Sequence, residues 1–329
     1  MLHGHGDDAC HYPHLRYNFS SNIYAAPCHD ALLAHLREAL PSIAAYPEPD
    51  AAALTRVLAR RHGVDTDCVL VTAGVTEAIY VVAQAAAASG LHRYGCLSPT
   101  FSEYASASEM FGLKAAGSDA AAADIFWLCN PNNPTGDVAS ADAVMDMSRS
   151  CPWLIVDQAY AGYTLTPAVT AQQAIRAGNV VLLHSLTKSY AIPGLRVGYV
   201  VAAPELTARL RRFMRPWSVG TVAMAAARWL VQHDARVLPC KDALLAESQR
   251  LYTSLAALSA VDVHPTATTF MLLRHHSIKA AELKERLAHE HGLLIRDASN
   301  FDGLSAYHFR VAAQTRAADD ALIAALSSL

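Results

Sequence analysis

Short apolar runs alternate with amphipathic stretches through the first two thirds of the chain. The runs are bounded by turn-forming residues, which predicts buried β-strands, and helix-like segments lie between several of them. Strands that alternate with helices form mostly parallel sheets covered on both faces, so we expect an α/β fold. The predicted strands are Val69–Thr72, Tyr94–Ser98, Asp124–Cys129, Trp153–Asp157, Val180–Ser185 and Gly198–Ala202.

Helical periodicity precedes and follows the first of these strands. Leucines recur at helical spacing from Leu32 to Leu40, and a second helical pattern runs from Asp50 to near Gly63. A third helix is expected to begin at Gly74, directly after the first strand.

The pattern changes from about Pro204 onward. A long helical stretch over 206–258, broken near Pro216 and Pro239, leads into strands near 270–274, 293–296 and 308–312, a helix over 279–291 and a last helix from Ala317. This predicts a smaller α+β domain. We expect three parts: an N-terminal arm and helix (1–40) that packs with the small domain, a large domain (41–215), and the long helix with the small domain (216–329).

Composition narrows the class of protein. Hydrophobic residues make up 53% of the 329 positions, enough for a large core, and the formal net charge of −3 gives no basic surface for nucleic acid or membrane lipids. The longest apolar run, Ala78 to Ala88, is too short to span a bilayer, and no signal peptide is recognisable. Seven cysteines without a C-x-x-C pair favour reduced thiols and a cytoplasmic location.

Glycine and hydroxyl residues mark the first strand-to-helix turn. Ala73-Gly74-Val75-Thr76 would expose free N–H groups at a helix N-terminus, which suits a phosphate, although an ordinary βα turn has the same appearance. The segment is neither a dinucleotide fingerprint nor a Walker loop.

Polar residues also follow three later strands. Asn130-Pro-Asn-Asn133-Pro-Thr-Gly136 lies at a strand end, where open α/β sheets bind ligands, and Asp157 ends the next apolar run. A buried acid there needs a cation or hydrogen-bond donor unless it caps a helix. Two hydroxyls, a lysine and an arginine follow the next strand, in the stretch from Ser185 to Tyr199. A lysine held between apolar strands can act as an amine nucleophile, whereas a lone lysine is usually solvated.

Together these four segments resemble the pyridoxal-phosphate enzymes of the class I/II aminotransferase family, from about Arg16 to Leu329. The resemblance implies fold type I, with a large, mostly parallel sheet domain, a smaller α+β domain, and pyridoxal 5'-phosphate as cofactor. Lys188 would form the Schiff base and move a proton at Cα. Asp157 would keep the pyridine nitrogen protonated, and Asn133 and Tyr160 would bind the ring 3'-oxygen.

The same resemblance assigns the remaining cofactor residues. Phe101 would stack on the ring, unless it is simple core packing. Tyr46 matches a tyrosine that reaches the phosphate of the neighbouring subunit, which implies a homodimer, although a tyrosine packed in a proline turn is an equal alternative. The phosphate would be held by Gly74, Val75, Thr76, Ser185, Thr187 and Arg196.

In such an enzyme, the residues that contact the substrate decide which bond to the substrate Cα breaks. Arg310 matches the family's carboxylate-binding arginine, with a structural ion pair as its alternative, and Asn22 is a further substrate candidate. A phosphate on the substrate could be bound by Arg16, Arg296, Asn300 or the N-terminal histidines. His3, His5, His11 and His14 match no zinc spacing, so we expect no metal site.

Two groups within the family are most similar, the threonine-phosphate decarboxylases of cobalamin synthesis and the histidinol-phosphate aminotransferases. The stretches from Asn18 to Ile23, Ser98 to Tyr104 and Leu294 to Phe301 favour the decarboxylases. Gly220 and Gln314 depart from the usual pattern and leave the substrate open. The expected activity is therefore a carboxy-lyase acting on a phosphorylated amino acid, with an aminotransferase, or a non-catalytic binding protein on the same fold, as alternatives.

Overall fold

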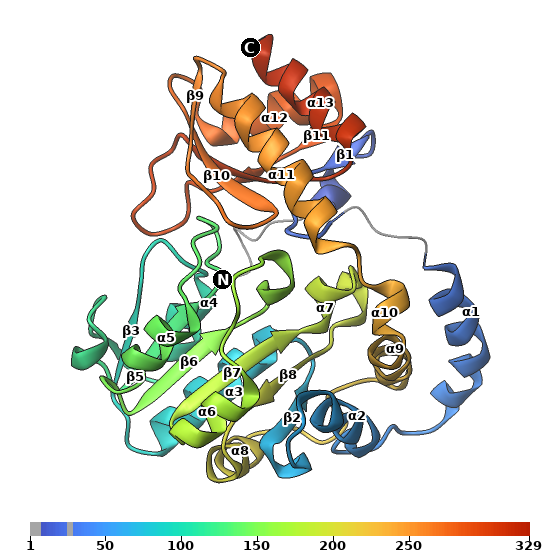
Figure 1. Ribbon diagram of the computed structural model, residues 1–329, viewed down its shortest axis with the longest axis vertical. Helices are drawn as coiled ribbons and strands as arrows, with labels where there is room; N and C mark the ends of the chain where they lie inside the picture. Colours follow the sequence, from blue (N-terminus) through green and yellow to red (C-terminus); the bar gives the residue numbers. More distant parts are fainter. Residues whose placement is uncertain (1–7, 25–28) are drawn as a thin grey trace.

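The computed structural model describes residues 8–24 and 29–329, and it divides into a large lobe and a small lobe (Figure 1). The large lobe contains a seven-stranded sheet in the order β2-β8-β7-β6-β5-β3-β4. Strand β8 is antiparallel to both of its neighbours, and the other pairings are parallel. The strands are β2 (Val69–Thr72), β3 (Arg93–Cys96), β4 (Lys114–Ala115), β5 (Ile125–Cys129), β6 (Trp153–Asp157), β7 (Val180–Ser185) and β8 (Gly198–Val201).

Helices bury both faces of this sheet. Alternate residues of one strand enter two separate hydrophobic cores, as Val71 and Leu70 show. One face is covered by α3 (Val75–Ala88), α4 (Glu103–Met110) and α8 (Pro204–Arg211), and the other by α2 (Ala52–His62), α5 (Ala141–Met147), α6 (Ala171–Ala177) and α9 (Thr221–Gln232). The expected α/β architecture with a mostly parallel sheet is confirmed.

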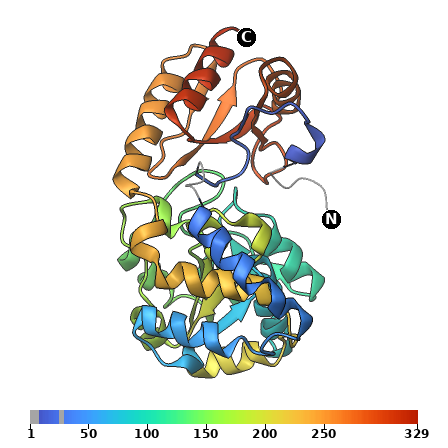
Figure 2. The same ribbon diagram turned by 90° about the vertical axis from the view of Figure 1, so that its right-hand side faces the viewer.

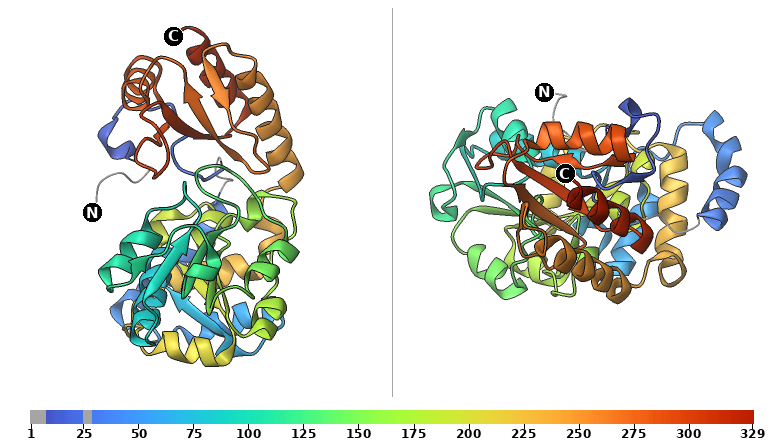
Figure 3. Two further views of the ribbon diagram at one scale, coloured as in Figure 1. Left: turned by 90° about the vertical axis from the view of Figure 1, so that its left-hand side faces the viewer. Right: turned by 90° about the horizontal axis from the view of Figure 1, so that it is seen from above.

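The small lobe holds an antiparallel sheet in the order β12-β13-β10-β9, which lies over the large lobe when viewed from above (Figure 3). Its strands are β9 (Val261–Val263), β10 (Phe270–His275), β12 (Arg296–Asp297) and β13 (His308–Ala312). Helices α11 (Lys241–Ala256), α12 (Ala280–His291) and α13 (Arg316–Ser327) pack on it around a third core. The short α7 (Leu186–Ser189) and α10 (Asp234–Val237) and six 3₁₀ turns (Ala9–His11, Leu40–Ala44, Thr66–Cys68, Ala120–Ala122, Ala161–Tyr163 and Pro193–Leu195) complete the described helices.

The cores divide the chain differently from the boundaries expected at residues 40 and 216. β1 (Tyr17–Asn18) pairs with β11 (Leu293–Leu294), so the arm does join the small lobe. However, α1 (Asp30–Ala39) packs against α9, and both lie on the large lobe (Figure 2). The reason is that α9 buries an alanine-rich apolar face, whose Ala227 and Leu230 share a core with Leu32 of α1.

Two smaller features also differ from the expectation. The single strand expected near 293–296 is two short strands, because β11 pairs with β1 while β12 pairs with β13 in another sheet. The helical stretch over 206–258 is broken near Pro216 and Pro239, as expected, and also at His233. Over residues 8–24 and 29–329, no helix combines the length and hydrophobicity that a membrane crossing requires.

Candidate active site

A cleft of about 300 Å³ lies where the strands of the large sheet end and the small lobe begins. Parallel strands β5, β6 and β7 deliver their following loops to one edge. Because β8 runs in the opposite direction, the connection from β7 to β8 stays at this edge too. The cleft is lined by Ser20, Ser21, Asn22, Ile23, Val75, Thr76, Phe101, Tyr104, Cys129, Asn133, Asp157, Ala159, Tyr160, Ser185, Thr187, Lys188, Pro193, Arg196 and Arg310.

Asp157, at the end of β6, is a buried carboxylate with a hydrogen bond to each oxygen. Its Oδ1 accepts from the backbone N–H of Ala159 at 2.9 Å, and its Oδ2 accepts from the hydroxyl of Tyr104 at 2.8 Å. Burial raises the pKa of Asp157 to about 6, while these two donors and the Lys188 charge act to lower it. The carboxylate therefore remains ionised near neutral pH and points into the cleft.

Lys188 reaches the same cleft from α7. Its Nζ lies 5.9 Å from the centre of the Tyr160 ring, and its backbone carbonyl accepts a hydrogen bond of 2.9 Å from the Tyr163 hydroxyl. Burial raises the pKa of Tyr160 above its ordinary value, so this phenol carries its proton at neutral pH. The amine thus lies on a short turn whose backbone is fixed by a buried hydroxyl.

The opposite end of the cleft is suited to a phosphate. Gly74 has a φ of 86° at the N-terminus of α3, and a Cβ added to it would lie 3.1 Å from Arg196 Nη2, so the guanidinium lies against this glycine. The Thr187 hydroxyl is buried and has no hydrogen-bond partner among the described residues. A phosphate group fits here, because the helix N-terminus offers N–H groups, an unsatisfied hydroxyl and a cation.

Close packing of two backbone segments fixes the position of the turn at Gly74, at the end of the cleft suited to a phosphate. A Cβ at Gly198 would lie 2.9 Å from the carbonyl oxygen of His184 and about 3.0 Å from the backbone of Gly74 and Val75. Strand β8 therefore touches the turn before α3 directly, and only glycine permits this approach.

Arg310 enters the cleft from β13 of the small lobe. One Nη donates to the side-chain oxygen of Asn133 and the other to the carbonyl of Ser20, while Nε is buried without a partner among the described residues. Burial lowers the pKa of Arg310 to about 10, which still leaves it charged. Both polar atoms of the Asn22 amide are also buried without a described partner. These unsatisfied groups are available to a substrate.

Several of the residues predicted for the site do not line the cleft. Tyr46 is 84% exposed, with its ring 5.2 Å from that of Trp217. Arg296 donates to the side chain of Asn300 at 2.9 Å, and neither lines the cleft. Arg16 lies on the surface beside the Tyr17 ring.

Of the N-terminal histidines, only His11 and His14 belong to the described residues. His3 and His5 lie outside the described residues, and His11 and His14 are exposed. No metal-binding group of three or more His, Cys, Asp or Glu side chains occurs in the part of the chain that the structure describes.

Several lining residues could not be recognised from the sequence, above all Tyr104 and Cys129. The spacing of Phe101 and Tyr104, three residues apart, is the one signal that could have shown that both face the cleft. Cys129 is a register partner of Asp157, which only the strand pairing reveals.

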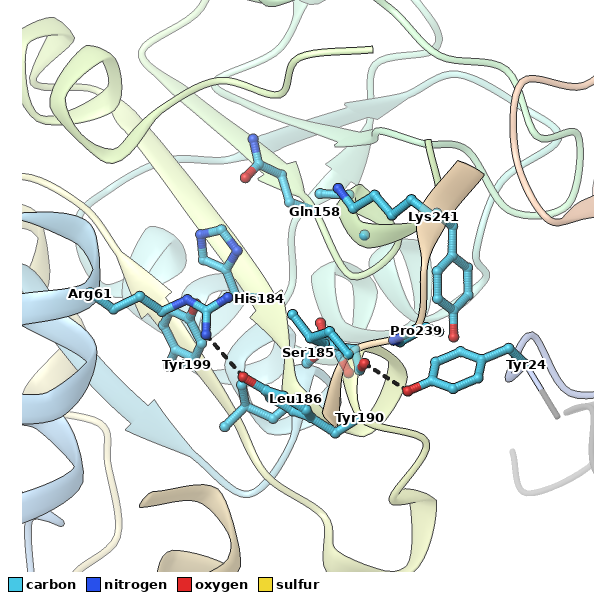
Figure 4. Close-up of a pocket in the computed structure, with 15 residues that line it drawn as sticks. Tyr24, Arg61, Gln158, His184, Ser185, Leu186, Tyr190, Tyr199, Pro239 and Lys241 are labelled. Carbon is cyan, nitrogen blue, oxygen red and sulfur yellow. Dashed lines mark hydrogen bonds between the residues drawn. The ribbon is translucent and has the colours of Figure 1, made fainter. Parts of the chain in front are cut away.

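A second cavity, of about 240 Å³, is lined by Arg61, His184 and Tyr199 among others (Figure 4). Arg61 forms an ion pair with Asp234 there and donates to the Tyr190 hydroxyl at 2.9 Å. His184 stacks on Tyr199, and burial lowers the pKa of His184 to about 3. These groups contact one another next to the C-terminal end of α7, where Tyr190 directly follows the helix.

Comparison with known proteins agrees with this geometry. The model for the aminotransferase class I and II family matches residues 16–326. The chain is 31% identical to the threonine-phosphate decarboxylase of Salmonella typhimurium, over 96% of this chain and 92% of that protein. It superposes on the L-threonine-O-3-phosphate decarboxylase of Porphyromonas gingivalis with a TM-score of 0.91 and 34% identity, over 95% of this chain and 98% of that one.

A third similarity concerns the fold. The histidinol-phosphate aminotransferase of Sinorhizobium meliloti, solved in complex with pyridoxal-5'-phosphate, superposes with a TM-score of 0.82 at 18% identity, over 95% of this chain and 90% of that one. The matches to the family model and to the Salmonella protein each extend over nearly the whole chain. The chain therefore belongs to the aminotransferase class I and II family and is a pyridoxal-phosphate-dependent enzyme.

Proposed function

We propose that this enzyme is a carboxy-lyase that converts L-threonine O-3-phosphate into aminopropanol phosphate and carbon dioxide, a reaction of cobalamin synthesis. The observation that carries the proposal is the likeness to two threonine-phosphate decarboxylases at 31% and 34% identity over almost the full chain. Histidinol-phosphate aminotransferases of similar coverage share less, from 18% to 28%. The cleft supports the same proposal, since it combines a buried anion, an amine and a buried arginine.

The cofactor would be held by residues from both ends of the cleft. The N–H groups at the start of α3, the hydroxyls of Ser185 and Thr187 and the Arg196 guanidinium would bind its phosphate. Asp157 would face the ring nitrogen, Asn133 and Tyr160 the ring 3'-oxygen, and Phe101 one face of the ring. When bound, pyridoxal 5'-phosphate supplies an electron sink for the pair left at Cα.

The residues of the chain have separate tasks in the reaction. Arg310 binds the substrate carboxylate, because its guanidinium is fixed in place by Asn133 and Ser20. The Cα–carboxylate bond breaks, carbon dioxide leaves, and Lys188 Nζ delivers a proton to Cα. Asn22 and Ile23 line the cleft and would help to exclude water from Cα.

The phosphate of the substrate needs a further cation. Arg296 is the register partner of Arg310 across β12 and β13, and the two cations are close enough for Arg296 to lower the pKa of Arg310. We therefore retain Arg296, with Asn300 and Arg16, as candidates for this group.

Transamination of histidinol phosphate is the alternative, and both reactions can be tested in one experiment. The holoenzyme is incubated with O-phosphothreonine alone, and separately with histidinol phosphate and 2-oxoglutarate, and the products are identified by mass. Release of carbon dioxide without a 2-oxo acid product supports the lyase. Formation of glutamate supports the aminotransferase, and no turnover in either case supports a non-catalytic binding protein.

We also propose a homodimer with Tyr46 of each subunit reaching the cofactor phosphate of the other. The support is the exposure of Tyr46 beside other exposed apolar side chains, namely Leu40, Ile43 and Trp217. The free thiols of the described cysteines support a cytoplasmic location.

A further inference from the structure

Asp157 is a buried carboxylate whose proposed role requires it to carry a negative charge. It must be ionised and oriented, yet burial favours its neutral form and brings its pKa to about 6. The titratable groups around it are Tyr104 from α4, Cys129 from β5, Tyr160 after β6 and Lys188 from α7. Of its two hydrogen bonds, one comes from the backbone of Ala159 and is fixed by the chain. The other comes from a side chain, the Tyr104 hydroxyl.

Tyr104 is held rigidly. Its side chain is fully buried, and its ring stacks on the Trp127 ring with an interplanar angle of 9° and a centroid distance of 5.3 Å. The indole N–H of Trp127 in turn donates to Ser108, on the same helix as Tyr104, at 3.0 Å. The ring of Phe101 closes the remaining side in an edge-to-face contact at 5.7 Å. The phenol therefore cannot turn away from Asp157.

In the hydrogen bond with Asp157, the Tyr104 hydroxyl is always the donor. Burial and the neighbouring Asp157 carboxylate raise the pKa of Tyr104 well above its ordinary value, so its oxygen always carries the proton. The phenol can thus only donate, and the partner that gains from it is the ionised carboxylate.

We propose that Tyr104 is a positioning residue that keeps Asp157 ionised and directed at the ring nitrogen of the cofactor. This inference rests on the proposed function for the role of Asp157, but the hydrogen bond acts on the carboxylate with or without cofactor. The helix α4 region then supplies two parts of the site, the Phe101 ring as a wall and the Tyr104 hydroxyl as a support for the anion.

The test uses Tyr104→Phe, which keeps the stacked ring and removes only the hydroxyl. Full-length apo-protein labelled with [4-¹³C]aspartate is titrated by NMR, and Asp157→Asn identifies the resonance. We expect the midpoint of Asp157 to rise by about one pH unit in Tyr104→Phe, a tenfold change in its ionisation constant. In the holoenzyme, the loss of kcat should approach about tenfold as the pH falls below the wild-type midpoint, with little change in KM, because the ionised fraction falls in the same proportion.

Tyr94→Phe is the matched control. Tyr94 is also buried and donates to a carboxylate of α4, Glu109, at 2.8 Å, but it does not line the cleft. Its replacement should leave both the Asp157 midpoint and kcat unchanged. Ser108→Ala, which keeps the phenol but frees the Trp127 ring, should shift the midpoint in the same direction by less, and this variant serves if Tyr104→Phe does not fold.

The outcomes separate the two proposals. An unchanged midpoint in Tyr104→Phe overturns the role of Tyr104, as does a loss of kcat that Tyr94→Phe reproduces. If the wild-type protein does not decarboxylate phosphothreonine, the proposed function fails while the NMR titration still decides the role of Tyr104.

Discussion

Arg310 and Asn133 join the two lobes through one hydrogen bond, from a guanidinium on β13 to an amide oxygen in the loop after β5. The residue expected to bind the substrate carboxylate thus directly supports a residue expected to bind the cofactor. Loss of the arginine leaves the Asn133 and Ser20 oxygens buried without a donor, so its replacement affects both binding and folding.

Arg310→Leu should therefore lower kcat/KM by about 100-fold, mainly through KM, and destabilise the protein by about 3 kcal/mol. Steady-state kinetics and urea unfolding measure the two effects. Arg274→Leu, on the neighbouring strand but exposed, is the control and should change neither. A normal KM in Arg310→Leu would exclude its substrate role.

Lys188→Ala should abolish the covalent adduct that borohydride traps between the protein and pyridoxal 5'-phosphate. It should also reduce turnover by at least about 10³-fold, since both the nucleophilic amine and the proton donor are lost. Intact-mass spectrometry reads the adduct. Lys241→Ala, which changes the second cavity instead, should keep it. Persistence of the adduct in Lys188→Ala would refute the assignment.

Gly198→Ala should weaken cofactor binding by about tenfold or more, because its Cβ would push the turn at Gly74 away from β8. Absorbance titration of apo-protein with pyridoxal 5'-phosphate measures the dissociation constant. Gly194→Ala, in the same connection but with open space around it, should bind as the wild type does. Equal affinities for both variants would contradict the tight contact.

His184→Phe should make the protein less sensitive to acid. The folded-state pKa of His184 lies near 3, below its ordinary value of 6.5, so the unfolded chain binds a proton first and stability is lost as pH falls from about 7 toward 3. Removal of this histidine should reduce the slope of the unfolding free energy against pH by about 1.4 kcal/mol per pH unit below pH 6. The phenyl ring keeps the stacking on Tyr199.

Urea unfolding of apo-protein between pH 4 and 8 measures this slope. His35→Phe, another histidine stacked on an aromatic ring, Trp229, is the control and should keep the wild-type slope. If both variants lose stability with acid as steeply as the wild type, His184 is not responsible.

Mixing two inactive variants tests the dimer. Tyr46→Ala and Lys188→Ala each impair every site of their own dimer, but a mixed dimer has one site with both residues intact. Equal mixtures should recover about a quarter of wild-type activity after subunit exchange. Tyr46→Ala alone should bind cofactor more weakly. If the mixture stays inactive although mass spectrometry shows mixed dimers, Tyr46 does not act across subunits.

The sequence allowed the meeting of Asn133, Asp157 and Lys188 in one cleft to be predicted, for a physical reason. Residues directly after parallel strands lie at one edge of the sheet, so these three could be placed together from the order of the strands. Their types and order then indicated the family.

Features that depend on tertiary packing could not be predicted. The partner of the apolar face of α9 is α1, which no periodicity reveals, and this moved the boundary between the lobes. In the sequence, Tyr104 cannot be distinguished from other buried aromatic residues, and only the structure shows its hydrogen bond to Asp157 at the end of β6. The hydrogen bond from Arg296 to Asn300, which lies outside the cleft, is likewise a tertiary contact that the sequence does not reveal.

The reversed direction of β8 has a further consequence. Lysine and arginine, eight residues apart, lie on one short loop that is anchored by β7 at its start and β8 at its end. The amine proposed to bind the cofactor and the guanidinium proposed to bind its phosphate therefore lie on a single loop whose length is set by the chain. An insertion or deletion of even one residue between Lys188 and Arg196 would misalign these two groups on pyridoxal 5'-phosphate. This loop should therefore tolerate substitution but not a change of length.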